Sequence, residues 1–284
     1  MTADRTWEPA IGEAELTRLT RAMDDAHRAT LPLMHAAGAD LTKELRARRA
    51  GGRGATTTAP DAGRRRFLIG AGGTAAALVL AACSSGGKDG ANPAPSSAAT
   101  TAAGSTSATA SASATGKYTG DLKVVALATA LENQAVGAYQ STLDAAKAGK
   151  LGTVPPALAN FVTTAMAQHA EHAKAWNAVL TGAGLPAITD VPLSNQADTV
   201  AALNKASSVG DVAKLALQLE NQAAQTYLFA TYNVTSPAGI ATAASIAPVE
   251  AMHAAILNYV LGQYPVPDDF LPTDKAASPG LLTV

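Results

Sequence analysis

Two stretches of the chain, LENQAVGAY (131–139) and LENQAAQTY (219–227), nearly repeat each other. Each carries a glutamate followed seven residues later by a tyrosine, which pairs Glu132 with Tyr139 and Glu220 with Tyr227. Seven residues are close to two helical turns, so on a helix each tyrosine shares a face with its own glutamate. The repeat therefore predicts two equivalent helices, each with a Glu/Tyr face.

The apolar pattern around the repeat predicts an all-α fold, a four-helix bundle. Apolar residues recur at spacings of three and four, and proline or glycine marks most ends. Short loops join the first helix to the second and the third to the fourth, which predicts two antiparallel hairpins. A longer segment, 183–208, crosses over between the hairpins. The expected helices are 120–148, 155–182, 209–234 and 237–262.

Glutamate is scarce in the C-terminal part of the chain, although it is a favoured residue on helix surfaces. From residue 84 onward there are four glutamates and three histidines, and every glutamate lies beside a histidine or in the repeat. This distribution indicates a role other than solubility. The residues are Glu132, Glu171, Glu220, Glu250, His169, His172 and His253.

On a bundle, all four helices contribute to this set of acids and histidines. Glu132 and Glu220 belong to the first and third helices, whereas HAEH (169–172) and EAMH (250–253) belong to the second and fourth. A glutamate and a histidine three residues apart, as in EAMH, point at the same interior spot. Carboxylates and imidazoles suit iron or manganese, and unpaired carboxylates in a dry core are costly. The pattern thus predicts a buried metal site.

This arrangement, together with the LEN helix, resembles the ferritin-like family, in its branch of exported bacterial proteins with a twin-arginine signal. The resemblance covers about 120–262. It implies one or two iron or manganese ions, with Tyr139 and Tyr227 placed beside the ligands. The ligands implied are Glu132, Glu220, Glu250, His172 and His253.

His169 departs from the family pattern, because it stands where the pattern has a glutamate, and we keep it among the candidate metal residues. The site then has three carboxylates, instead of four, for two divalent ions. A weaker dimetal site and a single-ion site therefore both stay open. His169 taken alone is expected beside the ligands or partly exposed. Glu171 lies about 100° away from His172 around the helix, so it is a poor replacement.

Residues 63–83 have the form of an export signal. Arg64 and Arg65 precede an apolar run that is short for a membrane-spanning helix. The run ends in Leu80-Ala81-Ala82-Cys83, which resembles a bacterial lipobox and contains the sole cysteine. The sequence predicts export by the twin-arginine machinery and lipid attachment at Cys83, on the extracytoplasmic face of the cell membrane.

The remaining segments are expected to lie outside the bundle, which is assigned to 117–265. Residues 84–116 are rich in Ser, Thr and Ala and predict a disordered linker. Residues 266–284 form a C-terminal tail. Residues 1–62 fit either an extended cytoplasmic leader or a translation start placed too early, and we assign no function to His27 or His35.

Two function classes follow from the sequence. One is a metal centre with oxidase- or peroxidase-type redox activity. The other is a non-catalytic structural or partner-binding module with a degenerate metal site. Nucleic-acid binding is disfavoured, since 117–284 has eight lysines, no arginine and twelve acids. No hydrolase triad motif or glycine-rich phosphate loop occurs in the sequence.

Overall fold

Residues 9–51, 117–267 and 271–284 of the 284-residue chain are described by the computed structural model. Within these ranges the regular secondary structure is helical, apart from one isolated β-bridge between Leu193 and Leu282. The all-α prediction is confirmed. The helices are α1 Glu13–Gly51, α3 Asp121–Lys147, α4 Pro156–Gly182, α5 Gln196–Lys205, α6 Val209–Asn233, α7 Pro237–Val260 and the short 3-10 helix η1 Pro279–Leu281.

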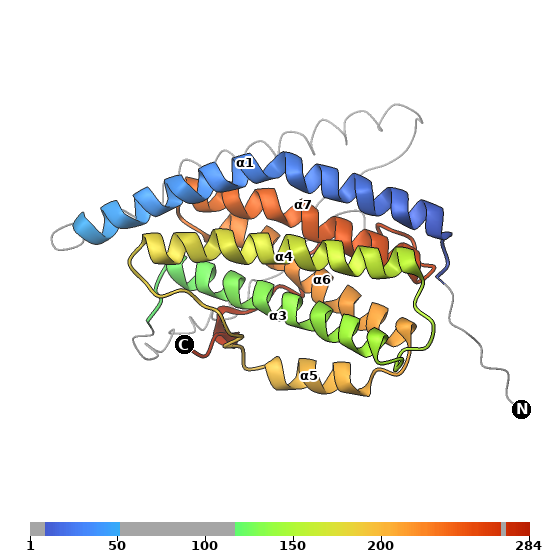
Figure 1. Cartoon of the computed structure of the whole chain (residues 1–284). Helices are drawn as coiled ribbons and strands as arrows, with labels where there is room; N and C mark the ends of the chain where they lie inside the picture. The colour runs from blue at the N-terminus through green and yellow to red at the C-terminus, as the bar shows by residue number, and fades with distance from the viewer. Residues whose placement is uncertain (1–8, 52–116, 268–270) are drawn as a thin grey trace, which may run out of the picture. The chain divides into compact units, whose positions relative to one another are not determined.

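The two predicted hairpins are present: α3 packs on α4, and α6 packs on α7 (Figure 1). Local sequence explains where these helices begin. Pro156 and Pro237 occupy the first turns of α4 and α7, where a missing N–H costs nothing. Ser236 caps α7 by accepting a hydrogen bond from the Gly239 N–H. All four helices begin and end within two residues of the expected positions.

The crossover between the hairpins contains a helix that the sequence pattern did not predict. This helix, α5, has ten residues and none of them is buried, so it lacks the apolar stripe that marks a longer helix. The C-terminal segment returns to the crossover, where the Thr283 N–H donates to the Pro192 carbonyl at 2.9 Å. It also docks on α6, since the Ala277 N–H donates to Thr226 Oγ1 at 2.8 Å.

A fifth long helix, α1, lies along α4 and α7 (Figure 1). It runs parallel to α4 and contacts both of its ends. Glu13 accepts a hydrogen bond from the Ala157 N–H at 3.2 Å, while Arg46 and Arg49 donate to the carbonyls of Gly182 and Ala183. An acid at the N-terminus and cations at the C-terminus complement the dipole of α4. Residues 13–51 therefore belong to the folded unit.

The fourth bundle helix, α7, is apolar around its whole circumference. By length and composition alone it would pass as a membrane span, yet more than half of that span is buried within the protein. It contacts α6 on one side and α1 on the other. A helix covered on several sides needs no polar face, so its composition reflects the presence of α1.

The core has two apolar regions, one toward each end of the bundle, with a polar layer between them. Along α7, Ile246 belongs to one region and Ile256 to the other, and Glu250 and His253 lie between. The same order of apolar, polar and apolar residues holds along α1, α3, α4 and α6. The polar layer thus sits at mid-height on all five long helices.

Candidate metal centre

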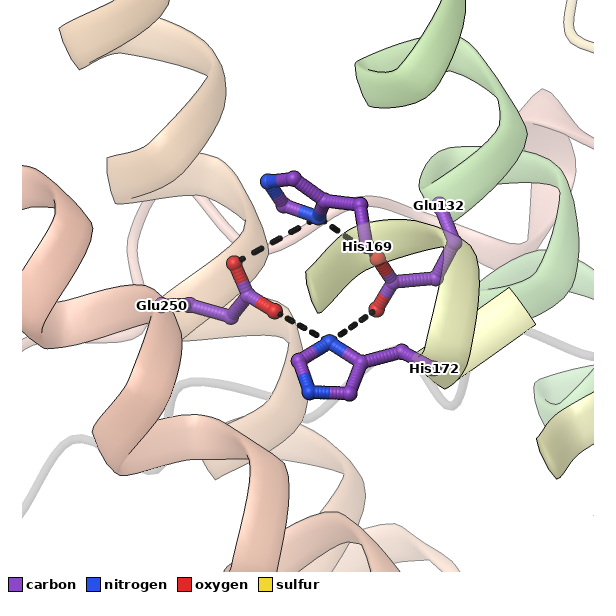
Figure 2. A group of neighbouring side chains, drawn as sticks. All are labelled: Glu132, His169, His172 and Glu250. Atoms are coloured by element: carbon purple, nitrogen blue, oxygen red, sulfur yellow. Dashed lines mark hydrogen bonds and ion pairs between the residues drawn. The ribbon is translucent and has the colours of Figure 1, made fainter. Parts of the chain in front are cut away.

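Six side chains of the polar layer form one buried cluster, and each is at most 2% exposed. They make two overlapping groups whose ligand atoms lie close enough together to hold an ion, and His169 and Glu250 belong to both groups. Figure 2 shows the first group, with two histidines from α4 facing glutamates from α3 and α7. The groups are Glu132, His169, His172 and Glu250, and His169, Glu220, Glu250 and His253.

In the first group, each carboxylate faces both histidines. His169 Nδ1 lies 2.7 Å from Glu132 Oε2 and 3.7 Å from Glu250 Oε2. His172 Nδ1 lies 2.9 Å from Glu250 Oε1 and 3.5 Å from Glu132 Oε1 (Figure 2). Ligands bound at right angles about 2.1 Å from an ion are about 3 Å apart. The spacing of these atoms therefore suits a single ion among them.

The second group is built on α6 and α7. His253 Nδ1 lies 3.2 Å from both Glu220 Oε2 and Glu250 Oε2. The other nitrogen of His169, Nε2, lies 3.1 Å from Glu220 Oε1. His169 thus points one nitrogen at each group, and its burial rules out the partly exposed position considered for it. Glu171 lies at the surface beside Lys174, at 3.8 Å, and takes no part.

The protonation states of the cluster follow from its carboxylates. Burial alone would lower the histidine pKa values, but Glu250 and Glu220 hold the pKa of His169 well above its usual range. Burial is likewise outweighed at His172, where Glu132 raises the pKa to about 9. Burial would raise the pKa of Glu132, but His172 and His169 lower it to about 2. The metal-free cluster thus balances carboxylates with imidazolium groups.

Two atoms of this cluster interact by charge alone. His172 Nδ1 and Glu250 Oε1 form an ion pair at 2.9 Å, but they are not aligned for a hydrogen bond. Neither atom finds another hydrogen-bond partner among the residues that the structure describes. Buried polar atoms without partners are costly. An ion shared by the imidazole and the carboxylate would satisfy both, so the donor set fits a divalent cation.

The two tyrosines of the repeat contact the cluster in a crossed arrangement. Tyr139 on α3 donates to Glu220 on α6, and Tyr227 on α6 donates to Glu132 on α3. Trp176 Nε1 donates to the Tyr227 hydroxyl at 2.9 Å. Burial, followed by the nearby carboxylate, holds the pKa of each phenol well above its usual value. Both phenols therefore stay protonated as hydrogen-bond donors.

A small cavity lies between α3 and α6, which touch each other much less than the helices within each hairpin do. Its volume is about 30 Å³, which is room for roughly two water molecules. Nine of its 19 lining residues are alanine or leucine, and one of them is Leu203 of α5. Glu132, His169 and Glu220 line it too, so the cavity reaches the cluster.

Helix α1 brings further polar residues to this layer, and the sequence analysis missed them. His27 is 3% exposed, and its ring centroid lies 5.2 Å from that of His172. Burial, and then the charge of His172, lowers the pKa of His27 to about 4. His35 is exposed. The composition of α7 could have indicated a further covering helix. A bundle helix with one side in water needs charged residues on that side, and Glu250 is the sole charged residue of α7.

The three residues assigned to export and lipidation, Arg64, Arg65 and Cys83, lie outside the described residues. So does the whole of the predicted linker, 84–116. The predictions for these segments therefore stay predictions.

A family model described as a ferritin-like domain matches residues 120–263. The matched range begins just before α3 and ends just after α7, and it contains the whole Glu/His cluster. Comparison with curated proteins and with solved structures gave no match. The match covers half of the chain and leaves α1 outside it.

Proposed function

The chain belongs to the ferritin-like family, and on that premise we propose that its Glu/His cluster binds iron or manganese and supports oxidase- or peroxidase-type redox activity. The observation that carries the proposal is the pair of overlapping groups at mid-height of the bundle. They unite three carboxylates and three imidazoles in the buried core of the bundle. That donor mixture suits iron and manganese.

The side chains of the cluster have distinct tasks in this proposal. Glu132, Glu220 and Glu250 supply negative charge for the ions, and the histidines exchange protons for metal. When bound, iron or manganese would supply the electron transfers that side chains alone do not perform. Tyr139 and Tyr227 orient two of the carboxylates and keep their own protons.

The cavity between α3 and α6 favours a small oxidant as the second substrate. Its volume of about 30 Å³ is room enough for dioxygen or hydrogen peroxide. Most of its exposed wall is apolar, and a surrounding of low polarity strengthens electrostatic interactions at the cluster.

Metal binding is tested with the full chain and two matched variants. Glu220→Gln removes one buried carboxylate with little change in shape, whereas Glu171→Gln makes the same change on the surface. After identical loading with Fe²⁺ or Mn²⁺, mass spectrometry should find less metal in Glu220→Gln than in the parent and in Glu171→Gln. Equal metal content in all three proteins would exclude the proposed ligand set.

Redox activity needs a separate measurement, because a metal-binding module need not be catalytic. The iron-loaded parent is expected to consume dioxygen or peroxide faster than the Glu220→Gln variant and faster than free iron at equal concentration. If metal binds and neither oxidant is consumed, the non-catalytic alternative stands.

The predicted location of the protein is a separate proposal, which rests on the sequence of residues 63–83. We propose that the twin-arginine machinery exports the chain and that Cys83 anchors it to the extracytoplasmic face of the membrane. Cys83→Ala should then leave the protein unprocessed or released from the membrane fraction, whereas Ser84→Ala should not. Cleavage before Cys83 would remove residues 13–51 from the anchored chain, whereas α1 packs on α4 and α7 in the folded unit. Peptides from 13–51 that co-purify with the bundle from the membrane fraction would show that α1 is retained, and their absence would show that the anchored protein lacks α1.

A further inference from the structure

A continuous hydrogen-bonded path leads from the surface of α1 into the cluster. Asp24 on α1 accepts a hydrogen bond from Gln168 Nε2 at 3.2 Å. Gln168 Oε1, on the buried side chain from α4, lies 2.8 Å from His253 Nε2. The other nitrogen of His253, Nδ1, faces Glu220 and Glu250. Three helices thus contribute to one path that ends at a candidate ligand.

Asp24 decides which way the Gln168 amide points. A carboxylate only accepts hydrogen bonds, so it takes the NH₂ group of the amide and turns the carbonyl oxygen toward His253. The opposite orientation would set the amide oxygen against the Asp24 carboxylate, acceptor against acceptor. Arg28 holds Asp24 from the solvent side, with Nε 2.9 Å from Oδ2.

The orientation of Gln168 in turn decides which nitrogen of His253 keeps a proton. Because the amide oxygen only accepts, His253 must donate to it from Nε2. The proton on Nε2 leaves Nδ1 as the nitrogen that can bind an ion. Nδ1 is also the nitrogen that lies 3.2 Å from both glutamates. The hydrogen-bond partner of a metal-binding histidine fixes its tautomer and ring orientation in this way.

We propose that α1 is a working part of the metal centre, with Asp24 and Gln168 as positioning residues that hold His253 as an Nδ1 ligand. This inference rests on the proposed function, because it assumes that the cluster binds a metal. It goes beyond the family match, because that match begins at residue 120 and Asp24 lies on the helix outside it.

Loss of either positioning residue has a defined consequence. Without Asp24, the Gln168 amide is free to rotate and to offer its NH₂ group to His253. The favoured partner is then an imidazole with a bare Nε2 and a proton on Nδ1, which opposes metal binding. Without the amide of Gln168, Nε2 has no acceptor at all.

The test uses the full chain, Zn²⁺ as a diamagnetic probe, and four variants. Asp24→Leu and Gln168→Leu break the path from opposite ends. The double variant Asp24→Asn with Gln168→Glu restores both hydrogen bonds with the carboxylate and the amide exchanged. The asparagine donates to the new carboxylate, which still accepts from His253. Asp25→Leu removes a neighbouring exposed charge from α1 and serves as the control.

Two measurements are made on each protein. Zn²⁺ affinity is measured by calorimetric titration, and ¹⁵N spectra of labelled histidine identify which nitrogen of His253 carries the proton. We expect each leucine variant of the path to bind Zn²⁺ about 10- to 100-fold more weakly than the parent. The double variant should recover most of the loss, and the control should match the parent. The Zn²⁺-loaded parent should show a proton on Nε2 and none on Nδ1.

Each outcome supports or overturns the inference. If Asp24→Leu only detached α1, Gln168→Leu would keep both its affinity and its His253 spectrum, and the inference would fail. A proton on Nδ1 of His253 in the Zn²⁺-loaded parent would overturn it directly. If the parent binds Zn²⁺ and the path variants bind it equally well, the inference fails while the proposed metal site stands. If the parent binds no metal, both fall.

Discussion

The hydroxyl of Tyr227 on α6 donates its hydrogen bond to Glu132 on α3, and not to Glu220 of its own helix. Tyr139 makes the reciprocal contact from α3 to Glu220. Two helical turns span about 10 Å, so each phenol is better placed to meet the glutamate of the facing helix. The repeat therefore ties the two hairpins together at the candidate metal centre.

The two tyrosines differ in one respect, which gives the first prediction. Tyr227 also accepts a hydrogen bond from Trp176, so Tyr227→Phe leaves both the indole N–H and a carboxylate oxygen of Glu132 without this partner. Tyr139→Phe affects Glu220 alone. Each buried group left unpaired costs about 1–3 kcal/mol. Urea unfolding of the metal-free protein should show a larger loss of free energy of unfolding for Tyr227→Phe, and equal losses would contradict this assignment.

The helix boundaries and the acids of the cluster could be predicted because their signals are local. Proline and serine mark helix starts, and four glutamates in an otherwise glutamate-poor segment stand out. The crossed tyrosine contacts could not be predicted, because spacing along one helix does not say which facing helix a side chain meets. The position of His169 between the two groups could not be predicted from the sequence for the same reason.

The largest omission was α1, because residues 52–116, for which we predict an export signal and a linker, separate it from the bundle in sequence. Its own pattern is only moderately amphipathic, and Pro32 lies inside it. What identifies its position is the tertiary contact with α4 and α7. The composition of α7 carried the information indirectly, since one charged residue in 24 leaves no side of that helix suited to water.

The second prediction concerns His169, a position at which the sequence resemblance led us to expect a glutamate. His169→Glu supplies a fourth carboxylate to the two groups and should raise the number of metal ions bound per chain and their affinity. The same change removes an imidazolium from the metal-free cluster, so the metal-free protein should unfold more easily. His169→Gln, a neutral residue of similar size, is the control. Unchanged metal stoichiometry in His169→Glu would indicate a site built for a single ion.

The third prediction is that metal uptake strengthens as pH rises. Carboxylates hold the pKa of His172 at about 9 and that of His169 well above its usual range, so both are protonated at neutral pH without metal. A bound ion must displace these protons. Affinity should therefore rise between pH 5.5 and 7.5, about tenfold per pH unit for each proton released, as calorimetry in buffers of different ionisation enthalpy would show. Uptake without proton release would contradict the assigned protonation states.

The fourth prediction is a loss of stability in mild acid that depends on His27. Its pKa is lowered to about 4 in the folded state, so between pH 6.5 and that value the unfolded chain binds a proton that the folded chain does not. As the pH is lowered, the free energy of unfolding of the metal-free protein should decrease by up to about 1.4 kcal/mol per pH unit. His27→Leu should flatten this slope between about pH 5.5 and 4.5.

That window isolates His27 from the cluster. Histidines with raised pKa values are almost fully protonated in both states from about one unit below their ordinary value of 6.5, so they contribute little slope below about pH 5.5. Their contribution to stability is lost only as pH rises toward their folded pKa values. The pKa of Glu132 is lowered to about 2, so its contribution is lost only below its ordinary value of 4.5. A slope between about pH 5.5 and 4.5 that persists in His27→Leu would assign the acid sensitivity elsewhere.

The last prediction tests the docking of α1 through a glycine at the end of α4. A Cβ atom added at Gly182 would lie 2.4 Å from the Thr42 Cγ2 atom of α1. Alanine normally stabilises a helix relative to glycine by up to about 1 kcal/mol. Here Gly182→Ala must displace Thr42, and overpacking of this kind costs about 1–3 kcal/mol. Gly137, on an exposed face of α3, has nothing within 4 Å of an added Cβ atom, so Gly137→Ala is the matched control.

The two variants should therefore change stability in opposite directions. Urea unfolding should show Gly182→Ala to be less stable than the parent and Gly137→Ala to be equally or more stable. Hydrogen exchange should locate the loss in α1, with faster exchange of its amides in Gly182→Ala. Because α1 carries Asp24, the same variant should also bind Zn²⁺ more weakly, although residue 182 touches none of the metal-site residues. If α1 were detached in solution, Gly182→Ala would gain stability as Gly137→Ala does, since no Thr42 would then stand in its way.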